Sequence, residues 1–346
     1  MKITWTKIFI TISLTIILSI IATVLWIDPY FHYHAPLGRF QYRLYDERYQ
    51  NDGILRHFDY DSIIIGTSMT RNFRASEWDA LMSAKTVKVP FSGASYKEIG
   101  DTLKRVLARK GDKINYVVRG IDYSMLSDSP DSMRYDSYPT YLYDNNYLND
   151  VEYLLNKQVL LTDLYNGVIE YTNSGLQTVD FDRYRNDDKG VYGKEHVMST
   201  YTREEKTNES GYFHLNPENI QQNVIQVASD NPNTEIFLFI TPYSILYFDQ
   251  LNQRGELKNH LQQEKEAIEM LLEIDNIHVF SFFDEFDLIT NFDNYLDYLH
   301  YGQDINSYIL ECMANGTHEL TKDNYIDYCN RCKRFYENYD YDVLFE

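Results

Sequence analysis

Positive charge is scarce in this sequence of 346 residues, which holds 32 Lys and Arg against 52 Asp and Glu. The formal net charge is therefore −20 at pH 7. A protein that binds nucleic acid needs a basic patch to offset the phosphate charge, so the balance argues against a nucleic-acid partner. Low-complexity tracts and internal repeats are absent outside one apolar run near the N-terminus. What remains is a globular chain long enough to bury a large core.

Cysteine is scarce too, and Cys312, Cys329 and Cys332 all lie close to the C-terminus. The C-x-x-C pair, with His318 as a candidate fourth ligand, is a weak zinc pattern, so we assign no metal and no cofactor. Outside the cytoplasm we expect one disulfide, Cys312 with Cys329 or Cys332, and one remaining thiol. The alternative is that all three thiols are free and packed.

The only long apolar run is Ile8–Trp26, which carries no charge. Its length is close to the roughly 20 residues that a helix needs to cross a bilayer. Lys2 and Lys7 precede the run, so the positive-inside rule predicts a cytoplasmic N-terminus and a single-pass anchor at 1–27, with residues 28–346 outside. A cleaved signal peptide is the alternative, but no small-x-small site follows. We expect the aromatic segment 28–34, with its His-x-His, to pack against the membrane surface.

The stretch 61–71 contains a candidate nucleophile. Three isoleucines at 63–65 predict a buried strand, Gly66-Thr67 predicts a sharp turn, and a helix-compatible run follows Ser68. This strand–turn–helix pattern places a serine hydroxyl at the carboxyl edge of a parallel sheet and near a helix N-terminus. The alternative is an ordinary turn in which Ser68 caps a helix. A catalytic serine also needs a base, an orienting acid and an oxyanion hole.

A candidate base lies in the D-x-x-H motif formed by Asp297 and His300. In a turn, residues three apart can point the same way, so the carboxylate can orient the imidazole, as in a Ser-His-Asp triad. A second D-x-x-H, Asp275 to His278, runs straight into a predicted strand. We expect His278 at the opposite edge of the sheet from Ser68, so position favours His300.

At this point the chain resembles the SGNH (GDSL-type) hydrolase superfamily over residues 58–126 and 215–312. The likeness rests on the Gly-x-Ser turn, on Gly93 after the second strand and on the late D-x-x-H. The tethered arrangement resembles the branch that includes teichoic-acid D-alanylation and alginate-acetylation proteins. The resemblance implies that Ser68 is the nucleophile, that Asp297 and His300 are the acid–base pair, and that the Gly93 amide contributes to the oxyanion hole.

The third oxyanion element departs from the superfamily, which has an Asn where this chain has Asp122. A carboxylate accepts hydrogen bonds and does not donate them, so facing an oxyanion it would be repulsive. We therefore expect the Asp122 carboxylate to turn away from Ser68, held by backbone donors, Arg119 or Arg71. The oxyanion hole would then consist of the Ser68 and Gly93 amides. The alternative is that the protein does not hydrolyse esters.

Alternating apolar runs predict an α/β fold, a mostly parallel sheet flanked by helices. The resemblance adds a three-layer, flavodoxin-like arrangement. We expect strands at 61–66, 86–90, 114–121, 235–241 and 277–283, and helices at about 76–84, 95–110, 216–230 and 255–274. Ligands of such sheets bind at the carboxyl ends of the strands, where Ser68, Gly93 and Asp122 fall.

A polar insertion rich in Tyr, Asp and Asn, residues 127–214, interrupts this alternation. We expect helices at Asp150–Leu161 and Asp163–Tyr171 and a lid-like loop region. Exposed tyrosines there would stack on a glycan, or would form a surface with no ligand. Arg71, close to Ser68, would recognise an anionic substrate group or pair with a nearby carboxylate.

Together these features predict a membrane-anchored serine esterase or acyltransferase. By resemblance it would act on a cell-envelope glycan or teichoic-type polymer, with a membrane-bound acyltransferase as a candidate partner. The main alternative is a catalytically silent binding or assembly component of the same fold. A hydrolase of lipids or small esters is a third reading.

Overall fold

The computed structural model describes residues 2–135, 138–175, 180–183, 190–207 and 214–346. The chain divides into two compact units. Unit 1 comprises Met1–Asp59 and Asp136–Arg185, and unit 2 comprises Tyr60–Tyr135 and Asn186–Glu346. This division differs from the predicted one, in which residues 28–346 form a single domain with an insertion at 127–214. Unit 1 is held together by contacts such as Tyr153 to Asp28, 125 residues apart, which local sequence patterns do not reveal.

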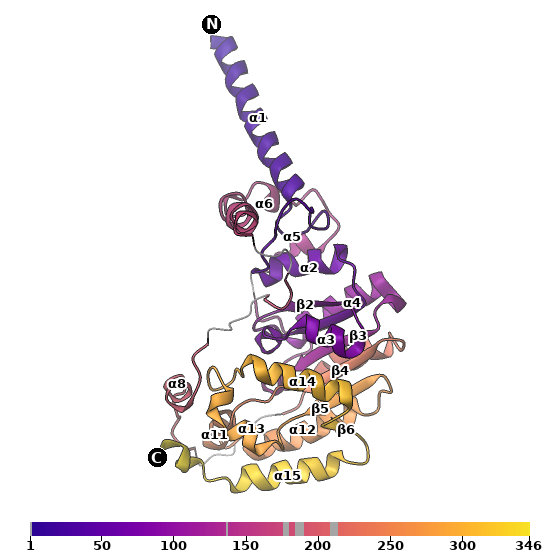
Figure 1. Cartoon of the computed structure of the whole chain (residues 1–346), viewed down its shortest axis with the longest axis vertical. Helices are drawn as coiled ribbons and strands as arrows, with labels where there is room; N and C mark the ends of the chain where they lie inside the picture. Colours follow the sequence, from indigo (N-terminus) through magenta and orange to yellow (C-terminus); the bar gives the residue numbers. More distant parts are fainter. Residues whose placement is uncertain (1, 136–137, 176–179, 184–189, 208–213) are drawn as a thin grey trace. The chain divides into compact units, whose positions relative to one another are not determined.

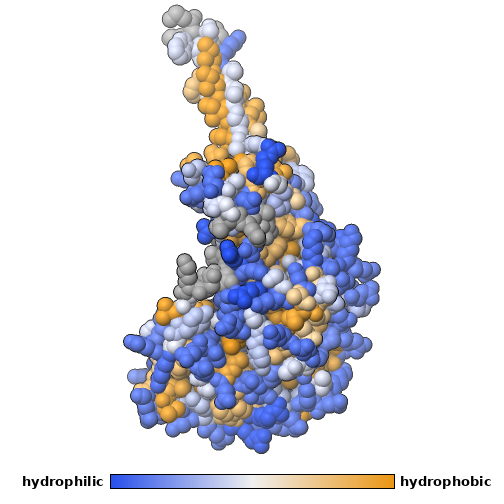
Figure 2. Space-filling view, in the orientation of Figure 1, coloured by the Kyte–Doolittle hydropathy of each residue, from blue (hydrophilic) through white to orange (hydrophobic). Residues whose placement is uncertain are grey.

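Unit 1 is helical and begins with α1 (Lys2–Ile27) (Figure 1). Within it, Thr4–Ile27 is long and apolar enough to cross a membrane, and its visible surface is largely apolar (Figure 2). The other elements of unit 1 are α2 (Glu47–His57), α5 (Thr140–Tyr143), α6 (Val151–Leu154), the π-helical segments η4 (Val159–Asp163) and η5 (Tyr165–Glu170), and α7 (Tyr171–Asn173).

Of the two helices predicted between residues 150 and 171, the first is present only as the short α6, and residues 157–173 form one continuous helix that contains π-helical stretches. Parts of the predicted insertion, at 136–137, 176–179, 184–189 and 208–213, lie outside the described residues.

Unit 2 is built on a mixed six-stranded sheet with the order β2-β1-β3-β4-β5-β6. Its strands are β1 (Ser62–Gly66), β2 (Thr86–Pro90), β3 (Tyr116–Ile121), β4 (Glu235–Ile240), β5 (Ile277–Ser281) and β6 (Glu319–Leu320). The first five pair in parallel, and β6 joins β5 antiparallel. The strands predicted from buried apolar runs are thus confirmed, because strands covered on both faces read as continuous hydrophobic runs.

Helices flank this sheet. The α-helices are α3 (Ala75–Met82), α4 (Tyr96–Lys110), α8 (Lys194–Ser199), α9 (Pro217–Ile220), α10 (Gln226–Ser229), α11 (Ile245–Gln253), α12 (Leu257–Leu271), α13 (Phe286–Thr290), α14 (Gln303–Asn315) and α15 (Tyr325–Asn338). A π-helical segment, η6 (Gln221–Ile225), joins α9 to α10. The remaining short turns are η1 (Ser68–Thr70), η2 (Gly111–Lys113), η3 (Tyr123–Met125), η7 (Phe292–Asn294) and η8 (Tyr341–Phe345).

The strand order places a topological switch beside β1. The chain passes from β1 to β2 on one side and then returns to β3 on the other side of β1. Because such crossovers are right-handed, α3 and α4 lie on opposite faces of the sheet. The loops that follow β1 and β3 therefore diverge at the carboxyl ends of these strands, where open α/β sheets bind ligands.

Candidate active site

Ser68 follows β1 at this switch point, in the turn that the sequence predicts. Ile63, Ile64 and Ile65 are buried, and the strand ends at Gly66. A side chain at Gly66 would meet the Thr70 methyl group at 2.5 Å, so only glycine allows the turn to close this tightly. The short 3₁₀ turn η1 follows β1 directly, and the helix predicted at about 76–84 is present as α3, which begins at Ala75. Ser68 therefore lies seven residues before α3, at the start of η1 and not at the N-terminus of a long helix.

Residues from the C-terminal part of the chain hold this turn in place. Tyr301 Oη donates to the Met69 carbonyl at 3.1 Å, and Asn306 Nδ2 donates to the same oxygen at 3.3 Å. Lys88 of β2 is fully buried and donates to the carbonyl oxygens of Arg71 and Phe73 at 2.7 and 2.6 Å. These contacts fix the backbone on both sides of the serine, and no sequence motif signals them.

The structure brings Ser68, His300 and Asp297 together. Ser68 Oγ lies 2.7 Å from His300 Nε2, and His300 Nδ1 lies 2.8 Å from Asp297 Oδ2. This geometry fits a serine that donates to Nε2 while Nδ1–H donates to the carboxylate, the arrangement of a Ser-His-Asp triad. About one third of the His300 and Asp297 side chains is exposed, at 35% and 33%, so substrate can reach the imidazole.

Asp297 also builds the turn that presents His300. Its Oδ1 accepts the backbone N–H groups of Leu299 at 2.8 Å and His300 at 2.7 Å. Burial raises the pKa of Asp297, but the hydrogen bonds from His300 and from the two amides outweigh burial and hold the pKa below its usual value. The carboxylate is therefore kept ionised, as an orienting acid must be.

Asp122 lies just after β3 and is 4% exposed. Its Oδ2 accepts from Thr67 Oγ1 at 2.9 Å and its Oδ1 accepts from Tyr243 Oη at 2.6 Å, so both oxygens are engaged by hydroxyl groups. The predicted partners are wrong, since Arg119 Nη1 instead donates to the Asn223 carbonyl at 2.6 Å. Burial raises the pKa of Asp122, although the bonds from Tyr243 and Thr67 lower it. Through Thr67, Asp122 positions the residue that precedes the nucleophile.

Gly93 follows β2 with a φ of +66°, a conformation that favours glycine. A side chain there would lie 2.7 Å from the Tyr135 hydroxyl, so Gly93 keeps the backbone accessible beside that ring. Within the described residues, neither the Gly93 amide nor the Ser68 amide donates to a backbone carbonyl. Both residues are partly exposed. Two N–H groups are thus available at the carboxyl edge of the sheet.

His278 is held apart from this site by its own partners. It lies in β5, with Nδ1 2.8 Å from Glu319 and Nε2 2.9 Å from Glu235, the first residue of β4. Burial lowers the pKa of His278, but the bonds to Glu319 and Glu235 raise it more, and the net pKa is raised. The expectation that the two D-x-x-H motifs lie at opposite ends of the strands is confirmed.

The cysteines form no disulfide in this structure, so the predicted pairing is wrong and the alternative of three free thiols holds. Burial raises the pKa of Cys329 to about 12 and also raises those of Cys312 and Cys332, which keeps the thiols protonated. His318 Nε2 contacts Tyr308 Oη at 2.9 Å. Among the described residues no group of His, Cys, Asp and Glu could hold a metal ion.

Arg71 directly follows η1, and its backbone carbonyl accepts the hydrogen bond from Lys88 described above. A role for its side chain in substrate binding stays a prediction.

A scan of protein-family models finds no match to this chain, and a search of curated proteins finds no significantly similar sequence. The chemistry of the site therefore has to be argued from its geometry.

Proposed function

We propose that this protein is a membrane-anchored extracytoplasmic serine esterase or acyltransferase of the SGNH type, acting on acyl groups of a cell-envelope polysaccharide or teichoic-type polymer. The observation that carries the proposal is the hydrogen-bonded series Ser68–His300–Asp297 at the carboxyl edge of the sheet. A serine, an imidazole and a carboxylate meet in this order and at hydrogen-bond distance when the serine serves as a nucleophile.

In the proposed reaction, Ser68 Oγ attacks the acyl carbonyl carbon while His300 Nε2 takes the hydroxyl proton. The resulting oxyanion accepts hydrogen bonds from the Ser68 and Gly93 amides. As the tetrahedral intermediate collapses, His300 returns the proton to the departing alcohol oxygen and an acyl-serine ester remains. Attack by water on this ester gives an esterase, and attack by a sugar hydroxyl gives an acyltransferase.

The choice of a polymer at the envelope rests on two features. The exposure of His300 and Asp297 suits a large substrate that cannot enter a closed cavity. The anchor Ile8–Trp26 with Lys2 and Lys7 before it favours a single pass with a cytoplasmic N-terminus. For transfer, a membrane-bound acyltransferase is the proposed source of the acyl group.

A second candidate function is a silent member of the fold that binds or assembles rather than catalyses. The observation in its favour is Asp122, which stands where the superfamily carries an Asn and provides only acceptors while ionised. The oxyanion would then lose one donor, which mutagenesis in other enzymes values at roughly 3–4 kcal/mol.

Labelling with a fluorophosphonate tests the proposal directly. The full chain in detergent micelles is treated with the reagent, and the modified peptide is mapped by mass spectrometry. We expect phosphonylation of Ser68, loss of labelling in Ser68→Ala, and unchanged labelling in Ser124→Ala, a serine that is exposed and follows β3. The same Ser68→Ala change should lower turnover of a short acyl ester by roughly 10⁴-fold or more. A folded protein that resists the reagent and has no esterase or transferase activity would support the silent alternative.

Protease added to intact protoplasts tests the proposed location. Residues 28–346 should be digested while α1 stays in the membrane and retains its N-terminus. Complete protection of the soluble part, or a mature N-terminus beyond Trp26, would contradict an anchored outward domain.

A further inference from the structure

In the proposed anchor, the length of α1 would bring its carboxyl end to the headgroup level of a bilayer. The stretch Thr4–Ile27 has 24 residues, which at 1.5 Å per residue gives about 36 Å against a hydrocarbon core of about 30 Å. Trp26 is half-exposed, and the Arg39 guanidinium lies 5.0 Å from the centre of its ring. An exposed Trp beside a cation is typical of the interface. In contrast, Val24 and Ile27 are buried against the rest of unit 1.

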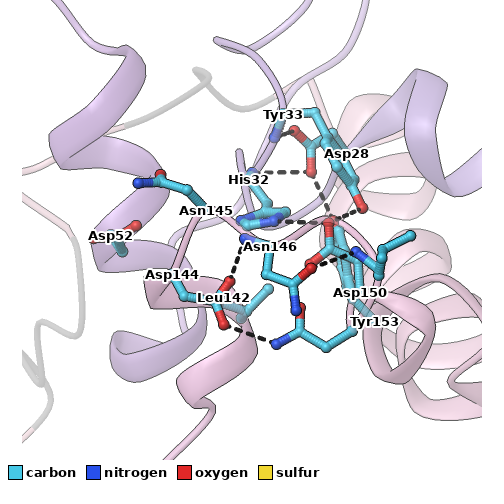
Figure 3. Close-up of polar contacts among 12 residues, drawn as sticks. Asp28, His32, Tyr33, Asp52, Leu142, Asp144, Asn145, Asn146, Asp150 and Tyr153 are labelled. Atoms are coloured by element: carbon cyan, nitrogen blue, oxygen red, sulfur yellow. Dashed lines mark hydrogen bonds and ion pairs between the residues drawn. The ribbon is translucent and has the colours of Figure 1, made fainter.

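A buried polar network fastens the segment around Asp150 to this end of α1 (Figure 3). Asp28 is fully buried, and its Oδ1 accepts from Tyr153 Oη at 2.7 Å and from the His32 amide at 3.0 Å. Asp150 Oδ2 in turn accepts from Tyr33 Oη at 2.8 Å and lies 3.2 Å from His32 Nε2. Because these groups are buried and bonded to one another, α6 cannot turn away from α1 without leaving polar atoms unsatisfied.

The same segment exposes several large apolar side chains. We call them the unit 1 apolar face: Tyr147 (67% exposed), Leu148 (90%), Val151 (53%), Leu155 (44%), Leu161 (66%) and Tyr165 (57%). Tyr147 and Leu148 lie in the turn before α6, Val151 is the first residue of α6, and Leu155 follows its last residue. Leu161 lies in η4, and Tyr165 is the first residue of η5. Both α6 and η4 pack against α1. Two of the elements that carry the apolar face therefore lie beside α1.

We propose that the unit 1 apolar face is a second membrane contact, inserted shallowly into the leaflet from which α1 emerges. This inference rests on the proposed anchorage of α1. Soluble proteins rarely expose apolar patches of this kind, whereas interfacial helices bury one apolar face at the boundary of headgroups and acyl chains. Lipid is the proposed occupant because α6 and η4 touch the proposed membrane anchor α1, and Figure 1 shows α6 beside the carboxyl end of α1. The polar network then fixes unit 1 to the membrane at a defined angle.

Photolabelling from the lipid phase tests this contact. The full chain is reconstituted into liposomes of phosphatidylcholine and phosphatidylglycerol that contain a diazirine-labelled phospholipid, and adducts are mapped by mass spectrometry after illumination. We expect adducts in α1 and in residues 147–165. Ile326, Val343 and Phe345, which are exposed apolar side chains of unit 2, serve as the internal control and should carry few.

The outcomes separate the two proposals. Adducts in α1 with none in 147–165, or adducts in 147–165 no more frequent than at the unit 2 control residues, would overturn the second contact and leave the anchor standing. No adducts in α1 would overturn the anchor itself. The double variant Leu148→Glu, Leu161→Glu should lower labelling of 147–165 several-fold without changing fluorophosphonate labelling of Ser68. The matched variant Val343→Glu, Phe345→Glu should leave labelling of 147–165 unchanged, and equal loss in both variants would contradict the inference.

Discussion

Asp122 offers the sharpest test of how this site is built, because Ala and Asn at this position should behave very differently. In Asp122→Ala, the Thr67 and Tyr243 hydroxyls lose their acceptor while both residues remain 3% exposed. A buried polar group without a partner costs about 1–3 kcal/mol, so we expect the free energy of unfolding to fall by about 2–6 kcal/mol.

Asp122→Asn keeps the volume and can still bond both hydroxyls, since its amide offers one acceptor and one donor group. It gives up two bonds to a charged group, each worth about 1.5–3 kcal/mol, for neutral bonds of about 0.5–1.5 kcal/mol. It also removes the penalty of burying an ionised carboxylate. Because burial leaves the pKa of Asp122 raised overall, this penalty exceeds the gain from the bonds. We therefore expect the free energy of unfolding of Asp122→Asn to lie within about 1 kcal/mol of the wild-type value at pH 7.

The pH dependence of this difference has a definite sign. A carboxyl group with a raised folded-state pKa binds more protons in the folded state, so the wild type loses stability as the pH rises through that pKa. The Asn variant lacks this titration and should gain on the wild type over the same window. Urea unfolding of the full chain in detergent micelles at several pH values measures it.

Two results would refute the reasoning. The first is an Asn variant as unstable as the Ala variant at pH 7, which would show that the ionised carboxylate is a net stabiliser. The second concerns activity. A carboxylate engaged by Thr67 and Tyr243 does not face the oxyanion, so Asp122→Asn should change esterase turnover by only a few fold. A rise of roughly 10²-fold or more would mean that the new amide serves as the missing oxyanion donor.

Further predictions concern the histidines and Gly93. His300→Ala should abolish turnover nearly as completely as loss of the serine, because triad members act as a unit. His278→Ala should retain turnover close to that of the wild type. Equal losses in a steady-state assay would mean that the wrong D-x-x-H was chosen. His278→Ala should instead lower the Tm most below about pH 6.5, because only the protonated ring is stabilised by Glu235 and Glu319. The difference in Tm from the wild type should vanish as the pH rises through the raised pKa of His278. A difference that grows with pH would contradict this reasoning. Gly93→Ala should lower both stability, by about 1 kcal/mol or more from the strain at positive φ, and turnover. Adding Tyr135→Phe should relieve the steric part alone, and full activity in Gly93→Ala by itself would exclude the Gly93 amide as an oxyanion donor.

Much of the sheet follows from the sequence because parallel strands buried on both faces leave an unmistakable apolar run. The isoleucines of β1 and the run Ile236–Ile240 of β4 are examples. The proximity of Ser68 and His300 was also predictable, since both motifs follow strands whose carboxyl ends meet at one edge.

The partners of Asp122 and the make-up of unit 1 were not predictable in this way. Tyr243 is 121 residues from Asp122, and Tyr153 is 125 residues from Asp28, so neither pair shares a local pattern. The two-residue strand β6 and the helices α14 and α15 were missed as well. A strand of two residues is too short to show periodicity.

The 232 residues that separate Ser68 from His300 have a consequence for the biosynthesis of the protein. At roughly 5–20 residues per second, a ribosome needs about 12–46 s to proceed from the serine codon to the histidine codon. Throughout this interval the nascent chain holds a nucleophile without its base. The proposed activity therefore requires synthesis to have passed His300, and a product truncated before residue 297 should be inert. The order of the motifs along the chain therefore delays the proposed activity until the segment that carries the base has been made.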